Sequence, residues 1–209
     1  MRIAETATRP VVIADTQDNP GAGGDSNTAG MLKALVENRA EGAAFGLMVD
    51  PVAAEIIHRA GVGAEVNLIF GGHSGVDGDE PFQALYTVEQ LHDGCFDATG
   101  PFYKGAEFNL GPCARILIGG TRVVLACNKV QMADQAMYRF VDIEPAEAKI
   151  LVNKSSVHFR ADFAPIAEEI LVCAAPGPMI ADPADLPWHR LRSGIRLNPL
   201  GPIWAGSAL

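Results

Sequence analysis

Blocks of apolar residues separated by polar loops run through the first seventy residues, and their lengths predict strands and helices in turn. Short apolar runs bounded by loop residues are typical of buried strands, whereas apolar positions three and four apart are typical of helices that cover a sheet. The predicted strands cover residues 9–14, 43–49 and 64–72, and the predicted helices cover residues 25–42 and 50–61. This alternation favours a parallel sheet with helices packed against it.

The ends of both predicted helices carry residues that stop or start helices. One of the polar residues 25–27 can cap the first helix, because their side-chain oxygens can accept from free backbone N–H groups. Asp50 is suited to cap the second helix, with Pro51 in its first turn and Gly61 at its end.

The pattern changes in the middle of the chain and then returns. Residues 81–130 show little helical periodicity and predict an antiparallel β insertion, with a hairpin that turns at residues 119–120. Residues 148–177 again predict strand, loop, helix and strand, in one layer with residues 9–70. We therefore expect an α/β fold, a mixed sheet with strand–loop–helix units, in which residues 1–209 form a single domain and residues 81–130 an antiparallel subdomain.

Charge and composition narrow the classes of partner. The formal net charge is −9 and no basic run is present, so neither a nucleic acid nor a membrane is an expected partner. No apolar stretch approaches the roughly 20 residues that span a bilayer, and the first ten residues lack the apolar core of a signal peptide. Four widely spaced cysteines without a CxxC pair favour reduced thiols and a cytoplasmic location.

Two polar loops follow predicted strands and precede predicted helices. In an open parallel sheet such loops lie at the carboxyl ends of the strands, where ligands bind. The first loop offers Asp15, Asp18, Asn19 and Asp25, and the second offers Lys154, Ser155, Ser156, His158 and Arg160.

Each of these residues also has a simpler structural interpretation as a helix cap, a turn residue or a solvated charge. Together they favour a functional cleft, because acids facing a basic set suit metal-assisted or acid–base chemistry on a polar substrate. If the loops share a cleft, Asp15 or Asp18 lies near His158 or Arg160, and Asp25 lies at the first helix's N-terminus.

Two short motifs can be compared with this first loop. The first is the phosphate-binding P-loop, which does not match because no lysine follows the glycines. The stretch "GGDSNTAG" is similar to the GDS block of serine esterases, which would make Ser26 a nucleophile. However, the pair Asp185 and His189 is one residue too long for the matching DxxH, and ten residues separate Asp15 from Asp25.

A longer resemblance covers nearly the whole chain. The stretches "RPVVIADTQDNPGAGGDS", "GPFYKG", "KSSVHFRADFAPIA" and "LPWHRLRSGIRLNPLGPIW" resemble, in order and spacing, the C-terminal domain of the microcystinase C family of metallopeptidases. The resemblance implies a zinc-dependent hydrolase of amide bonds in peptide-like small substrates. It also implies that an N-terminal domain with most of the zinc ligands is missing here, and that Met1 falls inside the helix leading into the C-terminal domain.

The resemblance implies that the acidic glycine loop lines or completes the cleft beside the zinc domain, with glycines whose backbone N–H groups approach the substrate. We expect catalytic roles for Asp15, Asp18 and His158. Substrate binding is expected of Asn19, Gly23, Gly24, Asp25, Lys154, Ser155, Ser156 and Arg160. No metal ligand is expected in this chain, which alone binds little zinc and is inactive. The alternatives are a non-catalytic domain that binds a small ligand or a partner, and an esterase that uses Ser26.

Overall fold

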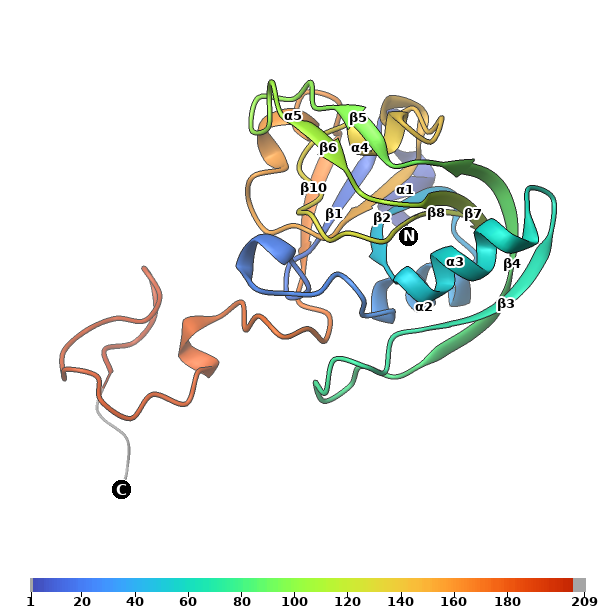
Figure 1. Cartoon of the computed structure of the whole chain (residues 1–209). Coiled ribbons are helices and arrows are strands. Elements are labelled where there is room, and N and C mark those ends of the chain that lie inside the picture. The colour runs from blue at the N-terminus through green and yellow to red at the C-terminus, as the bar shows by residue number, and fades with distance from the viewer. Residues whose placement is uncertain (1, 205–209) are drawn as a thin grey trace. The chain divides into compact units, whose positions relative to one another are not determined.

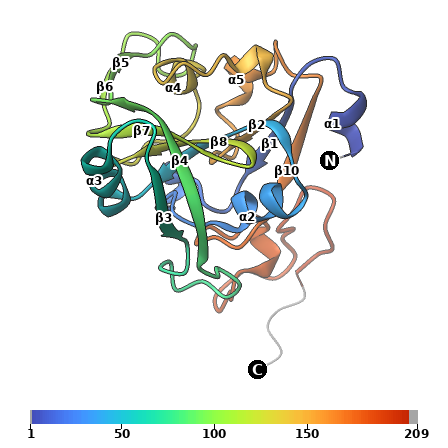
Figure 2. The same cartoon turned by 90° about the vertical axis from the view of Figure 1, so that its right-hand side faces the viewer.

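A computed structural model describes residues 2–204, which divide into two compact units, residues up to Met179 and residues from Ile180. The second unit holds a short 3-10 helix, Pro183–Asp185, and a bridge between Arg196 and Ile203. The first unit contains every named α-helix and strand of the described chain and is drawn in Figures 1 and 2. The prediction that all 209 residues form a single domain stays a prediction.

Eight strands form one mixed sheet in the order β10-β1-β9-β2-β8-β7-β4-β3. Their bounds are β1 Val11–Asp15, β2 Glu41–Val49, β3 Glu65–Phe70, β4 Phe82–His92, β7 Cys113–Ile118, β8 Gly120–Ala126, β9 Ile150–Asn153 and β10 Glu169–Cys173. The strands from β10 to β8 are parallel, and those from β8 to β3 are antiparallel. A separate antiparallel pair joins β5 (Cys95–Asp97) to β6 (Glu107–Asn109). The α/β class, the mixed sheet and the antiparallel insertion are confirmed.

The third predicted strand lies elsewhere than expected. Instead of joining the parallel layer, β3 pairs antiparallel with β4, and this hairpin curves around α2 (Gly30–Glu37) and α3 (Pro51–Ala60), as Figures 1 and 2 show. Leu68 and Phe70 point into the core while Ile69 is exposed, which is the period-two pattern of a half-buried antiparallel strand. Conversely, β8 of the predicted hairpin that turns at residues 119–120 joins the parallel strands by pairing with β2.

Local sequence signals set both ends of α3, whereas tertiary contacts set the start of α2. The Asp50 carboxylate accepts from the Ala53 N–H at 2.9 Å, and α3 ends at Gly61 with φ +85°, both as predicted. The prediction that one of residues 25–27 caps the first helix is wrong, because α2 begins only after Ala29 and no side chain caps it. The preceding residues are instead bound to Asp18, as described below.

Short helices complete the described fold: α1 (Arg2–Thr6), α4 (Ala136–Arg139) and α5 (Arg160–Phe163). One core packs α2 and α3 on one face of the sheet, and the other packs α4 and α5 on the opposite face. The central strands β1 and β9, and most of β2 and β8, are therefore buried on both faces. No helix among the described residues is long and apolar enough to cross a membrane.

Candidate functional site

The two polar loops begin side by side at the carboxyl ends of neighbouring strands. Strand β9 pairs in parallel with β1, so that Ala14 lies opposite Asn153. The loops that follow therefore leave the sheet at the same edge, as the sequence predicts.

A buried ion-pair cluster joins the loops at this point. The Lys154 ammonium donates to Asp18 Oδ2 at 2.7 Å, to Asp15 Oδ2 at 2.9 Å and to Thr28 Oγ1 at 3.0 Å. The side chains of Lys154, Asp15 and Asp18 are fully buried. All three ammonium hydrogens thus have an acceptor, which is the condition for a tolerable buried charge.

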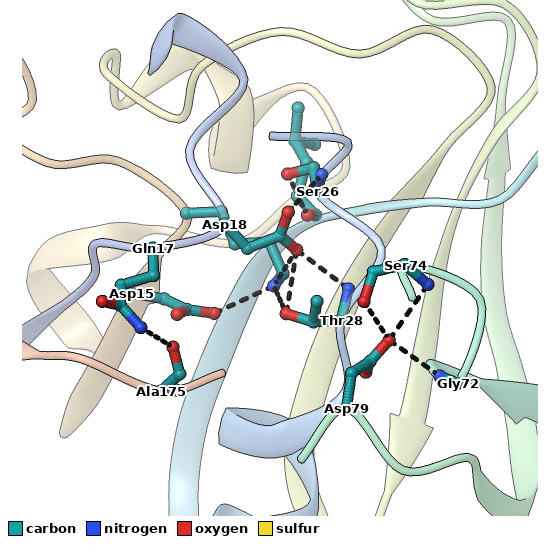
Figure 3. Close-up of polar contacts among 11 residues, drawn as sticks. Asp15, Gln17, Asp18, Ser26, Thr28, Gly72, Ser74, Asp79 and Ala175 are labelled. Atoms are coloured by element: carbon teal, nitrogen blue, oxygen red, sulfur yellow. Dashed lines mark hydrogen bonds and ion pairs between the residues drawn. The ribbon is translucent and has the colours of Figure 1, made fainter. Parts of the chain in front are cut away.

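Asp18 also folds its own loop. Its Oδ1 accepts from the Ser26 N–H at 2.8 Å, and its Oδ2 accepts from the N–H and the hydroxyl of Thr28 at 2.8 and 2.9 Å. Figure 3 shows this carboxylate enclosed by the two residues. Because these bonds hold residues 26–28 against Asp18, the helix starts later than its sequence signals suggest.

The two carboxylates differ in their surroundings. Burial raises the pKa of Asp15, and the nearby Lys154 offsets only part of that rise. Asp15 Oδ1 has no hydrogen-bond partner among the described residues. Burial alone lowers the pKa of Lys154, but the two carboxylates outweigh it, so the pKa is raised and the ammonium stays charged. Asp18 is thus the saturated partner, in the sense that both of its carboxylate oxygens accept hydrogen bonds. Asp15 is the acid whose charged form is disfavoured by burial.

A second set of bonds ties the loops above the cluster. The Asn19 amide donates to Ser156 Oγ at 2.8 Å, and the Ser156 hydroxyl donates to the Thr16 carbonyl at 3.2 Å. Asn19 is buried, and Ser156 is half-buried. These contacts fix the position of the second loop relative to the first.

The glycines shape the first loop instead of offering N–H groups to a ligand. The N–H groups of Gly21, Gly23 and Gly24 are taken by Asn19 Oδ1, the Pro20 carbonyl and the Asn19 carbonyl. A Cβ atom at Gly24 would lie 2.8 Å from the Asn19 nitrogen, so only glycine fits there. The expectation that these N–H groups approach a substrate is wrong for this conformation.

His158 lies on the surface beside the cluster. Its Nδ1 lies 3.1 Å from the Gln131 amide nitrogen, which also donates to Ser155 Oγ at 2.8 Å. Its ring stacks on Phe102 with centroids 4.1 Å apart and planes 18° apart. Val157, next to it, is 63% exposed and Phe102 is 42% exposed, so this corner of the loops faces outward.

Phe102 reaches His158 from the β5–β6 insertion. The loop between these strands is fixed at Gly100, whose N–H donates to Asp134 Oδ2 at 2.7 Å. Tyr103 packs edge-on against both Phe102 and Phe108. These contacts hold the insertion so that it brings an aromatic ring to the strand-end loops.

The family of the chain follows from a comparison with known sequences. Residues 13–190 match the family model described as MlrC C-terminus. The chain belongs to the MlrC C-terminal family. It is 25% identical over 176 residues to Microcystinase C of Sphingomonas sp, an alignment that covers 84% of this chain and 34% of that protein.

The fold of this MlrC C-terminal domain also occurs in a solved structure. The crystal structure of a "Putative metallopeptidase" from Mesorhizobium sp. BNC1 is similar with a TM-score of 0.79 and 23% identity. The match covers 91% of this chain and 38% of that chain. The MlrC C-terminal domain described here thus spans about a third of the length of the proteins it matches.

The cation that meets the two acids differs from the expected one. The sequence predicts Asp15 or Asp18 beside His158 or Arg160, but both carboxylates pair with Lys154. Arg160 instead lies over the Phe159 ring at 5.4 Å.

Asp25 and Ser26 also have other surroundings than predicted. Asp25 is exposed and pairs with Lys129 at 2.7 Å, so its predicted place at a helix N-terminus is wrong. Ser26 is fully buried, and its hydroxyl donates to the Leu47 carbonyl at 3.0 Å. A hydroxyl in that position does not serve as an esterase nucleophile.

Three residues of the site were missed by sequence reasoning. Gln131 carried no signal, because it is a single polar residue outside a recognised motif, and Thr28 lies in "GGDSNTAG" without any local feature that indicates its bond to Asp18. Phe102 lies in "GPFYKG", a stretch that marks the family, yet nothing local in the sequence places it beside His158.

The described residues do not fit a metal centre. No group of three or more histidine, cysteine or acidic side chains in residues 2–204 is arranged to hold a metal ion. At the acidic loop, the place between the two carboxylates is taken by the Lys154 ammonium.

Proposed function

We propose that this domain forms one side of the active-site cleft of an amide hydrolase that acts on peptide-like small substrates. The zinc of that hydrolase would be held by an N-terminal domain outside these 209 residues, which is the partner of this chain. Membership of the MlrC C-terminal family supports the hydrolase class, and the length of the relatives supports the existence of a further domain.

The observation that carries this proposal is the buried cluster of Lys154 with Asp15 and Asp18. This cluster uses a buried charge to hold two loops together at the carboxyl end of the sheet, which is where α/β proteins bind ligands. Helix packing alone would not need this arrangement, since both cores are apolar.

The residues then divide by burial. Asp15, Asp18, Lys154 and Ser155 are fully buried and position the loops. His158 is exposed and is the side chain that reaches the substrate. Asn19, Gly23, Gly24 and Ser156 set the shape of the loops beneath it, and Asp25 and Arg160 line the rim of the cleft. The four cysteines are free thiols, which fits a cytoplasmic location.

A chimaera tests the proposal. This chain replaces the matched 176-residue segment of the Sphingomonas protein, and amide hydrolysis of a short peptide substrate is measured. We expect the protein without its segment to be inactive and the chimaera to be active, with about one zinc per chain in both. A chimaera that is folded and zinc-loaded but no more active than the deletion would contradict the proposal. That negative result is what we expect under the alternative, in which the domain only binds a ligand or a partner.

A further inference from the structure

We propose that Gln131 is a positioning residue that holds His158 in its Nε2–H form, so that His158 donates a hydrogen bond to the substrate carbonyl oxygen. The identity of the ligand rests on the proposed function. The state of the imidazole does not, because it follows from contacts within this chain.

Two side-chain atoms that can accept a hydrogen bond lie within reach of the two N–H hydrogens of the Gln131 amide. Ser155 Oγ lies 2.8 Å from the amide nitrogen, and His158 Nδ1 lies 3.1 Å from it. The amide oxygen is farther from the same imidazole nitrogen, at 3.3 Å. Gln131 is only 4% exposed and Ser155 is fully buried, so the amide side of this contact is shielded from water although His158 itself is exposed. When Nδ1 of a neutral imidazole accepts, the proton is on Nε2.

The orientation of the imidazole ring is also fixed by stacking. Phe102 stacks on it at 4.1 Å, and Phe102 itself is braced by Tyr103 at 4.5 Å. Within residues 2–204, no group forms a hydrogen bond with His158 Nε2, and the residue is exposed. The ring therefore presents an oriented N–H donor to the outside of the loops.

This donor suits one step of amide hydrolysis. As the amide carbon becomes tetrahedral, negative charge develops on the carbonyl oxygen, and a fixed neutral donor stabilises it without giving up its proton. Neutral imidazoles act in this way in other enzymes. A general base would need the Nε2 lone pair, which the Nε2–H form lacks. In this form His158 can act as a hydrogen-bond donor to the oxyanion but not as a general base.

Nuclear magnetic resonance of the full ¹⁵N-labelled chain tests the tautomer directly. Long-range ¹H–¹⁵N spectra are recorded near pH 9, above the ordinary histidine pKa of about 6.5. The His158 signals are identified by their loss in His158→Asn. His58 is an internal reference, because its Nε2 lies 2.9 Å from the Cys113 carbonyl and must carry the proton.

Two substitutions give opposite expectations. Gln131→Glu supplies acceptors only, so the His158 proton should move to Nδ1, whereas Gln131→Leu should give a mixture of both forms. His58 should stay unchanged in all variants. An Nδ1–H form in the parent, or the same form in the parent and in a folded Gln131→Glu, would overturn the proposal. A thermal melt of each variant confirms that it is folded, and Gln131→Leu decides the matter if Gln131→Glu does not fold.

Activity of the chimaera provides the second readout. Gln131→Glu should lower kcat by 10-fold or more with little change in KM, since the donor acts on charge that develops during the reaction. A shifted tautomer with unchanged kcat would overturn the role of His158 as a donor. An inactive chimaera together with the expected tautomers would instead reject the proposed function and leave the positioning by Gln131 intact.

Discussion

The Lys154 ammonium lies 2.7 Å from Asp18 Oδ2, although the two residues are 136 positions apart in the sequence. Neither side chain is exposed. The pair links the loop after β1 to the loop after β9, and Thr28 and Asp15 complete its surroundings. Because breaking a buried pair leaves an uncompensated charge, the position of both loops depends on this contact.

Removal of the lysine charge tests that dependence. In Lys154→Met two carboxylates stay buried without a cation, so we expect a loss of about 3–5 kcal/mol in the free energy of unfolding. Urea denaturation measures this loss. Lys129→Met is the control, because its pair with Asp25 is exposed and should contribute less than about 1 kcal/mol. Equal effects of the two substitutions would show that the cluster does not hold the loops.

The two acids should respond differently to an amide. Asp18→Asn puts an N–H group where four hydrogen bonds converge on carboxylate oxygens, so we expect a loss of about 2–3 kcal/mol. Asp15→Asn should cost less than about 1 kcal/mol, because Asp15 Oδ1 has no described partner and the remaining oxygen can still accept from Lys154. The reverse order in urea denaturation would contradict the assignment of Asp18 as the saturated partner.

The raised pKa of Asp15 makes stability depend on pH in a definite direction. Between the unfolded carboxyl pKa of about 3.9 and the higher pKa in the folded chain, the folded state binds more protons than the unfolded state. The parent should therefore lose this contribution to stability as the pH rises through that window. Relative to the parent, Asp15→Asn should become steadily more stable as the pH rises through that window, which is where the two are compared. A difference that is constant or falls with pH would show that the pKa of Asp15 is not raised.

Ser26 provides a test of the serine esterase alternative. Ser26→Ala removes one buried bond to the Leu47 carbonyl, so we expect a loss of about 1 kcal/mol and no change in hydrolysis of a nitrophenyl ester. Ester hydrolysis by the parent that survives a chelator and disappears in a folded Ser26→Ala would establish the alternative.

Local signals were sufficient for some elements and insufficient for others. The helix from Pro51 to Ala60 could be bounded from the sequence, because Asp50 and Gly61 act through the backbone next to them. The β3 strand could be recognised but not placed, since its pairing with β4 depends on how the hairpin curves around α2 and α3. In the same way, the start of α2 depends on Asp18, which lies well before the helix in the sequence and binds Thr28.

The candidate site shows the same limit. The convergence of the two loops follows from strand–loop–helix order, which the sequence carries. Lys154, however, looks like an ordinary loop lysine, and nothing beside it in the sequence indicates full burial between two acids. The stacking of Phe102 on His158 depends on the path of the β5–β6 arm, which periodicity does not encode.

The central claim is that the strand-end loops of this chain present His158 to the substrate of an amide hydrolase. The most direct measurement is kcat of the chimaera carrying His158→Ala, compared with the chimaera carrying His73→Ala. His73 is also exposed, but it lies on the loop after β3. We predict that His158→Ala lowers kcat by roughly 100-fold or more, as for loss of an oxyanion donor, while His73→Ala stays within about twofold of the parent. Equal kcat values in the two variants, with equal zinc content and melting temperature, would contradict the account.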